Sequence, residues 1–334
     1  MASRPKALGN ELSLVRLIGR LAARVPARDV VVGIGDDAAV LRLAGFQAQA
    51  RLILSTDMMI EGSHFLRNLH PPRAVGYKAL ARALSDLAAM GAKPVACLLS
   101  LALPKDLDRR WLLEFLRGFT RASARWNVPL VGGDLGGAEQ VMCDVVVVGQ
   151  ASPRHLLTRA GARPGDWIVV SGSLGGAALG LESRRGPAWK RHLYPEPRLQ
   201  LGIALRPRLG ARAAIDISDG LLIDLHRLCL ASGVSAELSQ HPPRFAGANL
   251  KQVLSGGEDY ELLFAVPPNR RVPAQLCGVP LTVIGRFERG RPGRIRLLGR
   301  ELEPAGWDHF GSVLATSTDA ELGGFATGRS EVGQ

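Results

Sequence analysis

The chain lacks long apolar runs and is poor in cysteine. Its longest uninterrupted apolar stretches, such as Val145 to Val148, have the length of a strand, whereas a membrane helix needs about 18 residues. A membrane-spanning helix is therefore excluded, and we expect a soluble protein without a membrane partner. The four cysteines lie far apart and form no C-x-x-C pair. This spacing excludes a zinc site and a disulfide framework and favours a reducing cytoplasm.

Lysine and aromatic residues are also scarce for so basic a chain. The formal net charge is +12, but only six basic residues are lysine and aromatics make up 5%. The arginines are scattered along the chain, and the aromatics are too few for a base-stacking surface. We expect no nucleic-acid partner and only some attraction for anionic ligands. The P-loop signature G-x-x-x-x-G-K-[ST] is absent as well.

Length and pattern indicate a two-domain α/β chain. The 334 residues exceed the roughly 100–150 that are typical of one domain. Strand-like runs alternate with helical patterns, as in α/β proteins. The strand-like runs lie at 30–34, 38–43, 51–56, 95–103, 141–150, 167–171, 213–217, 261–266, 281–287 and 294–298. The helical patterns lie at 73–90, 108–126, 198–209 and 220–231.

The domain boundary is expected near 150–166, where two prolines and two glycines interrupt the strand pattern. We predict an N-terminal domain over 1–150, a C-terminal domain over 151–315 and a flexible tail over 316–334. Before the first strand, Asn10 and the helical spacing of the next leucines favour a capped helix over a transit peptide.

The stretch VVVGIGDDAAV at 30–40 imitates a dinucleotide-binding turn. A β-branched run enters the spacing G-x-G-x-x-A, and Asp57 stands where a ribose-binding acid would. A dinucleotide fold requires a helix directly after the turn. The gap before the next strand at 51 is too short for a crossover helix, which needs roughly a dozen residues. The sequence therefore argues against this fold.

Acidic residues recur at strand ends and turns beside glycine or a hydroxyl residue. They are Asp36, Asp37, Asp57, Asp134, Asp216, Asp219, Glu258 and Asp259, with Asp86 on the helix at 73–90. Carboxylates that converge at strand ends suit magnesium, which is usually shared between a few carboxylates and substrate phosphates. Magnesium would also resolve the repulsion between two aspartates and a phosphate in GIGDD.

Each acid also has an ordinary structural interpretation. Aspartate after glycine is a common turn former. Asp86 can form a surface i, i+4 pair with Arg82, and Ser218 with Asp219 can cap the following helix. His64 can be a satisfied loop histidine and Trp307 a packed aromatic. Taken one at a time, these residues predict no function.

Their joint order carries more information, because it resembles one family throughout residues 10 to 310. The motifs are GIGDDAAV, LSTDMMIEGSHF, GYKALARALSDLAAMGAKP, LVGGD, LTRAGARPGD, AIDISDGL, SGGEDYELLF and WDHF. This series resembles the thiamine-monophosphate kinases of the aminoimidazole ribonucleotide synthetase-like superfamily. The resemblance implies a mixed α/β (α+β), two-domain fold. It also implies a homodimer joined through the N-terminal sheets, with ATP in the cleft between the domains.

The resemblance implies transfer of the γ-phosphoryl group of ATP to thiamine monophosphate, the final step of thiamine diphosphate biosynthesis. The implied ligands of several Mg²⁺ ions are Asp37, Ser55, Thr56, Asp57, Asp86, Asp134, Asp216 and Asp219. The implied ATP contacts are Gly133, Asp134, Arg159 and Ser218. The residues implied to border thiamine monophosphate are His64, Glu258 and Trp307. Asp57, Asp134 and Arg159 are the implied catalytic groups, and Asp36 only shapes its turn.

Phosphoryl transfer needs positioning and charge neutralisation, which a site of many carboxylates and metal ions provides. The acceptor phosphate has a second pKa of about 6, so it needs no general base near neutral pH. Trp307 would then cover the cationic thiazolium ring, with Glu258 as a counter-charge.

Three alternatives stay open at this point. One is a sister ATP-dependent enzyme, such as an aminoimidazole ribonucleotide synthetase-like protein. The others are a non-catalytic nucleotide-binding regulator and a nicotinamide oxidoreductase. A substrate assay, nucleotide calorimetry and an NADH titration respectively distinguish them.

Overall fold

The first half of the chain forms a six-stranded sheet. The structure is a computed structural model, and it describes residues 12, 15–16, 29–42 and 50–309. Strands β1 (Val30–Val32), β2 (Ala39–Leu41) and β3 (Arg51–Ile60) pair antiparallel in succession. They are followed by β4 (Lys93–Leu103), β5 (Leu130–Gly137) and β6 (Met142–Ala151), in the spatial order β1-β2-β3-β6-β4-β5. Because β1, β2 and β3 are antiparallel neighbours, the rejection of a dinucleotide fold after GIGDD is confirmed.

Two helices follow the sequence expectation closely. Helix α2 (Pro72–Ala89) begins at a proline and is buried on nearly every side. Helix α3 (Arg109–Trp126) is capped by the side chain of Asp108 and ends at Asn127 in the left-handed conformation. The two helices approach closely because Gly118 has no side chain. A Cβ there would lie 1.9 Å from the carbonyl oxygen of Arg73.

The second sheet is mostly antiparallel and has the order β14-β13-β9-β12-β7-β10-β8, with β11 paired to β12. Its strands are β7 (Trp167–Ser171), β8 (Ala213–Ile217), β9 (Ser235–Leu238), β10 (Glu261–Val266), β11 (Gln275–Leu276), β12 (Val279–Glu288), β13 (Ile295–Leu297) and β14 (Arg300–Leu302). The helices of this half are α4 (Gly176–Ser183), α5 (Gly186–Leu193), α6 (Leu199–Ala204), α7 (Leu221–Ser232) and α8 (Leu250–Ser255), with a π-helical turn η1 (Leu205–Leu209) after α6.

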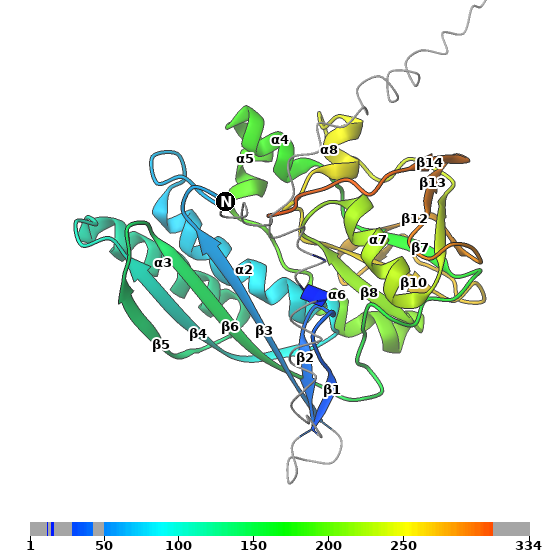
Figure 1. The fold of residues 1–334 in the computed structure, drawn as a ribbon, viewed down its shortest axis with the longest axis horizontal. Coiled ribbons are helices and arrows are strands. Elements are labelled where there is room, and N and C mark those ends of the chain that lie inside the picture. The colour runs from blue at the N-terminus through cyan, green and yellow to red at the C-terminus, as the bar shows by residue number, and fades with distance from the viewer. Residues whose placement is uncertain (1–11, 13–14, 17–28, 43–49, 310–334) are drawn as a thin grey trace, which may run out of the picture.

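The second sheet is covered on both faces, and its strands are apolar on both sides for that reason. In β10, Leu263 and Ala265 pack with α7 and α8 in one core. Leu262 and Phe264 point the other way and join the core that contains α2 and the first sheet. Helix α2 therefore lies between the two sheets, as Figure 1 shows, and can present side chains to both halves of the chain.

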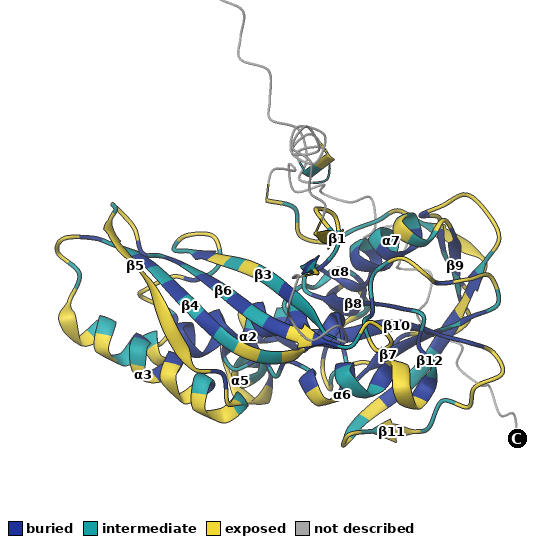
Figure 2. Ribbon diagram, turned by 90° about the horizontal axis from the view of Figure 1, so that it is seen from below, coloured by how far each residue is buried: buried dark blue, intermediate teal, exposed yellow. Residues whose placement is uncertain are grey.

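The strands and long helices expected from the sequence are present, with the helix expected at 198–209 divided into α6 and η1. The sequence missed β5, β9, β11, β14, α4, α5 and α8. Strand β5 is exposed along its whole length in Figure 2, which colours it yellow at the edge of the first sheet. The first sheet ends at Ala151 and the second begins at Trp167. The limits of the two domains stay a prediction. Of the expected N-terminal helix, residues 12, 15 and 16 are described and are helical, and its other residues and the expected C-terminal tail lie outside the described residues. No helix among the described residues is long and apolar enough to cross a membrane.

Candidate active site

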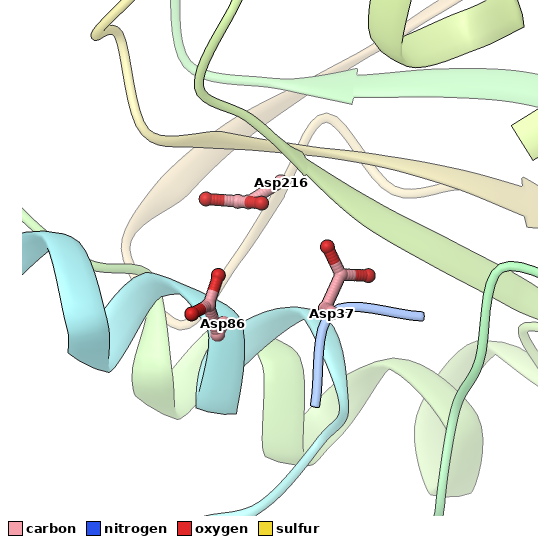
Figure 3. A group of neighbouring side chains, drawn as sticks. All are labelled: Asp37, Asp86 and Asp216. Carbon is pink, nitrogen blue, oxygen red and sulfur yellow. The ribbon is translucent and has the colours of Figure 1, made fainter. Parts of the chain in front are cut away.

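Three aspartates from distant parts of the sequence converge between the two sheets. Asp37 follows β1, Asp86 lies on α2 and Asp216 lies on β8. Each offers a carboxylate oxygen, and these oxygens all lie within 4.8 Å of one another. Figure 3 shows the three carboxylates pointing toward a common centre. We refer to Asp37, Asp86 and Asp216 as the acidic cluster.

Hydroxyl groups hold two of these carboxylates in place. Ser55 Oγ donates to Asp86 Oδ2 at 2.5 Å, and Ser85 Oγ donates to Asp216 Oδ2 at 2.6 Å. Arg159 Nη2 donates to Asp37 Oδ1 at 2.7 Å. The second carboxylate oxygen of Asp37 is buried and accepts no hydrogen bond from the described residues. The cluster is thus rigidly supported and keeps an oxygen available for a ligand.

The electrostatics of the cluster favour a bound cation. Burial, and then repulsion from Asp216, raises the pKa of Asp86 well above its usual value. Burial and repulsion from Asp37 do the same to the pKa of Asp216. Oxygen ligands at this density suit a hard divalent ion such as Mg²⁺, which would relieve the repulsion. The chemistry of these residues therefore fits the implied metal.

The alternative interpretation of Asp86, as a surface i, i+4 partner of Arg82, is wrong. Asp86 points toward Asp216 and accepts from Ser55, whereas Arg82 binds Asp57 through two hydrogen bonds of 2.9 and 3.0 Å. Helix α2 lies between two sheets, so side chains one turn apart on it face different partners. Asp36 fulfils its expected role in the turn, because its carboxylate accepts from the backbone N–H groups of Asp37 and Arg159.

A pocket of about 480 Å³ opens beside the acidic cluster. It collects many of the residues that the sequence singled out from both halves of the chain. Those that line it are Thr56, Asp57, His64, Asp86, Asp216, Ser218, Asp219, Glu258 and Trp307. Asp37 and Ser55 adjoin it through their contacts with Asp86 and with each other. A pocket of this size, with polar groups converging on it, is suited to a small ligand.

Three other predicted residues, Gly133, Asp134 and Arg159, do not line this pocket. Gly133 and Asp134 belong to the exposed edge strand β5, where Asp134 pairs with Ser100 of β4. Arg159 contacts the acidic cluster from the side of Asp37. Thr56 lines the pocket, but its hydroxyl donates to Asp144 Oδ1 at 2.6 Å and not to the cluster.

The turn that carries Ser218 and Asp219 is held from within the next helix. Oδ2 of Asp224 accepts from the backbone N–H groups of Ser218, Asp219 and Gly220. The alternative interpretation of Ser218 and Asp219 as a helix cap is therefore wrong, since Gly220 is the N-cap residue and the cap has no side-chain hydrogen bond. Asp219 instead pairs with Arg227 at 2.5 Å. Both side chains are left to line the pocket.

Glu258 is surrounded by buried groups that the sequence did not reveal. Its carboxylate lies 2.7 Å from Lys78 Nζ and 3.2 Å from His192 Nδ1, and His192 contacts His70 through ring nitrogens 3.1 Å apart. Burial alone would raise the pKa of Glu258, but Lys78, His192 and Arg82 lower it to about 2. Burial and Lys78 lower the pKa of His192 to about 3. Glu258 is thus a fixed anion and His192 a neutral ring near pH 7.

His64 and Trp307 close another side of the pocket through His309. The rings of His64 and His309 are 5.0 Å apart, and Trp307 Nε1 donates to His309 Nδ1 at 3.3 Å. His64 Nδ1 accepts from the backbone N–H of Ile60. Burial and then Arg82 lower the pKa of His64 to about 4, so this ring is neutral near pH 7. Only the motif WDHF hinted at His309.

Two of the missed residues, Lys78 and Arg82, share one partial signal with the predicted Asp86. Lys78, Arg82 and Asp86 are spaced i, i+4 along one stripe of α2, and all three reach the site. His70 and His192 come from segments with no recognisable motif, so their proximity depends on the fold.

Two family models match nearly all of the described chain. The model of the AIR synthase related protein N-terminal domain matches residues 35–151, and that of the AIR synthase related protein C-terminal domain matches residues 163–297. The chain is thus an AIR synthase related protein.

Relatives that match most of the chain show to which family within this class the protein belongs. The thiamine-monophosphate kinase of Escherichia coli (strain K12) is 39% identical over 323 residues, which cover 88% of this chain and 97% of the relative. The protein of Aquifex aeolicus (strain VF5) with the same name is 35% identical over 298 residues, covering 83% and 92%. The solved structure "AaThiL complexed with AMPPCP and TMP" has a TM-score of 0.81 at 34% identity and covers 93% of this chain and 100% of its own. The chain belongs to the thiamine-monophosphate kinase family.

Proposed function

We propose that the protein transfers the γ-phosphoryl group of ATP to thiamine monophosphate, with thiamine diphosphate and ADP as products. The observation that carries this proposal is the acidic cluster, of which Asp86 and Asp216 line a pocket that also contains Glu258 and Trp307. Family membership supports the same reaction, and the similar solved structure is described as a complex with AMPPCP and TMP. Phosphoryl transfer requires a cation site beside a pocket that binds the organic part of the substrate, and this arrangement supplies both.

The acidic cluster is proposed to hold Mg²⁺, with Ser55 and Ser85 keeping two of its carboxylates in position. A bound Mg²⁺ ion would neutralise charge on the transferring phosphoryl group. Arg159, already paired with Asp37, is proposed to place a second positive charge near the phosphates. Ser218 lines the pocket and would contact the nucleotide.

Gly133 and Asp134 are proposed to serve the nucleotide from strand β5. The absence of a side chain at Gly133 permits a close approach of β4, because a Cβ there would lie 1.8 Å from the carbonyl oxygen of Leu99. The side chain of Asp134 is exposed on this strand and is available to a ligand that extends along the sheet.

Thiamine monophosphate is proposed to bind at the side of the pocket formed by His64, Glu258 and Trp307. The fixed negative charge of Glu258 suits the cationic thiazolium ring, and the half-exposed indole of Trp307 can lie over it. Neutral His64 is suited to hydrogen bonding rather than to taking a proton. No general base is needed, because the acceptor phosphate is largely ionised near neutral pH.

A homodimer that joins the N-terminal sheets is proposed on the character of the first sheet. Val131 and Leu135 of edge strand β5 are 63% and 76% exposed, and Met58 of β3 is 49% exposed. An exposed apolar edge strand of this kind tends to pair with another chain, because its backbone groups and apolar side chains are uncovered. The cytoplasmic location stays a prediction from the cysteine pattern.

The direct test is incubation of the purified chain with ATP, MgCl₂ and thiamine monophosphate. Thiamine diphosphate should form, and omission of magnesium or addition of a chelator should abolish it. A chain with a native circular dichroism spectrum that forms no thiamine diphosphate would refute the proposal. Nucleotide binding by calorimetry without turnover would then favour a regulator, and ATP consumption with another acceptor would favour a sister enzyme.

A further inference from the structure

Asp57 and Arg82 form a two-point ion pair in the wall of the pocket. Arg82 Nη2 lies 2.9 Å from Asp57 Oδ1, and Arg82 Nε lies 3.0 Å from Asp57 Oδ2. The side chains are 11% and 20% exposed, so solvent screens them little. Such a planar, two-bond contact is the strongest form of arginine–carboxylate pairing.

This pair engages both oxygens of Asp57, whereas Asp37 of the acidic cluster keeps one oxygen that accepts no hydrogen bond from the described residues. In the described part of the chain, the carboxylates that converge on a common centre are those of Asp37, Asp86 and Asp216. Asp57 does not belong to this group. The sequence had placed Asp57 among the metal ligands on its resemblance to the family. The guanidinium of Arg82 supplies at this position the positive charge that a second ion would supply.

We propose that Arg82 takes the place of one divalent cation in this chain, by neutralising Asp57 permanently and confining metal binding to the acidic cluster. The inference deepens the proposed function, because it concerns the metals of the same site. It makes Arg82 a positioning residue that keeps Asp57 fixed in the pocket wall. Arginine suits this task because it stays charged at every accessible pH.

The arrangement also indicates where an ion would bind if Arg82 were removed. Asp219 lines the same pocket as Asp57, and its charge is near enough to oppose the ionisation of Asp57. With Arg82 gone, Asp57 would have no cation partner, while Asp219 would keep its pair with Arg227. A second divalent ion would then have carboxylate ligands from both halves of the chain.

The test is a Mn²⁺ titration of the full chain without nucleotide, in which electron paramagnetic resonance measures the free ion. Asp86→Asn and Asp216→Asn should weaken Mn²⁺ binding at least about tenfold. Asp57→Asn should leave the affinity and the number of bound ions unchanged. A loss of Mn²⁺ affinity in Asp57→Asn comparable to that in Asp86→Asn would overturn the proposal.

The reciprocal variant is Arg82→Gln, which should bind one more Mn²⁺ ion per chain than the wild type. Adding Asp57→Asn to this variant should remove the extra ion. A simple change of local charge would alter the affinity without adding an ion, and that result would also overturn the proposal. The matched control is Arg73→Gln on the same helix, since Arg73 pairs with Glu114 on the surface away from the pocket.

These titrations require neither ATP nor thiamine monophosphate. They therefore test the role of Arg82 even if the substrate assay fails. Conversely, product formation by a wild type whose Asp57→Asn variant loses Mn²⁺ would refute the inference and leave the proposed reaction intact.

Discussion

Lys78 Nζ lies 2.7 Å from Oε1 of Glu258, and this lysine side chain is only 3% exposed. Glu258 itself has a left-handed backbone, with φ of 68°, so both its main chain and its carboxylate are held in an unusual position. The pair joins α2 to the loop before β10 across the boundary between the sheets. Lys78 therefore fixes the orientation of the carboxylate that faces the pocket.

Replacing Lys78 with Met should destabilise the protein by about 1–3 kcal/mol, because it leaves a partly buried carboxylate without its cation. The pKa of Glu258 should then rise from about 2 toward its ordinary value. Urea unfolding measures the loss. The double variant Lys78→Met/Glu258→Gln should recover much of it, since no uncompensated charge remains. If the Lys78→Met variant were as stable as the wild type, the ion pair with Glu258 would contribute nothing to the stability of the fold.

Much of the fold was predictable because many of its strands are apolar. β7, β8 and β10 are β-branched or apolar runs that need no partner to be recognised. β5 has four glycines in eight residues, so its strand conformation comes from pairing with β4 and not from local preference. Helices α4 and α5 are short and contain glycine, and their stability comes from packing against each other and the remainder of this half.

The site was predictable only where family resemblance supplied the order of motifs. Asp37, Asp86 and Asp216 lie on a turn, a helix and a strand, and only the fold brings them together. The i, i+4 rule paired Arg82 with Asp86 because it sees one helix at a time. It cannot detect Asp57 on β3, which competes successfully for the guanidinium because it offers a two-point contact.

Asp86→Asn should stabilise the metal-free protein. The folded-state pKa of Asp86 is raised above its unfolded value, so ionisation of this group opposes folding above the ordinary carboxylate pKa of about 4. Asparagine removes that cost, and each pKa unit corresponds to about 1.4 kcal/mol. Differential scanning calorimetry in a chelator should show a higher Tm than that of the wild type.

The same Asp86→Asn variant should lose the increase in Tm that Mg²⁺ gives the wild type. The control is Asp106→Asn, an exposed aspartate in the segment before α3, which should leave both values unchanged. A metal-free Tm below that of the wild type would contradict the repulsion inferred within the acidic cluster.

Metal affinity should rise with pH. Because the pKa values of Asp86 and Asp216 are raised, these carboxylates keep protons at pH values where free aspartate is ionised. Mn²⁺ must displace those protons, so its affinity falls as the pH decreases through the range above the ordinary carboxylate pKa of about 4. Calorimetry in buffers of different ionisation enthalpy should detect proton release on binding. Equal Mn²⁺ affinity throughout this range would show that the cluster is fully ionised before the metal binds.

Gly118→Ala should destabilise the protein by about 1–3 kcal/mol, the usual cost of overpacking. The added Cβ would lie 1.9 Å from the backbone oxygen of Arg73 and force α2 and α3 apart. Gly136→Ala on β5 is the control, because a Cβ there meets no atom within 4 Å. Thermal unfolding compares the two variants. Equal stability would mean that the helices can separate without disturbing the core.

Trp307→Ala should weaken binding of thiamine monophosphate about tenfold, because a cation–π contact with the thiazolium ring contributes about 1–2 kcal/mol. Trp307 is 47% exposed, so its removal leaves the core intact and should not change Tm. Trp307→Phe keeps an aromatic face but not the indole N–H that donates to His309. It should therefore retain most of the affinity if ring stacking dominates.

Calorimetry with thiamine monophosphate and separately with ATP makes the distinction, since the ATP affinity should not change in either variant. Equal weakening in the Phe and Ala variants would instead assign the role of Trp307 to its hydrogen bond with His309, which keeps the histidine pair with His64 against the pocket.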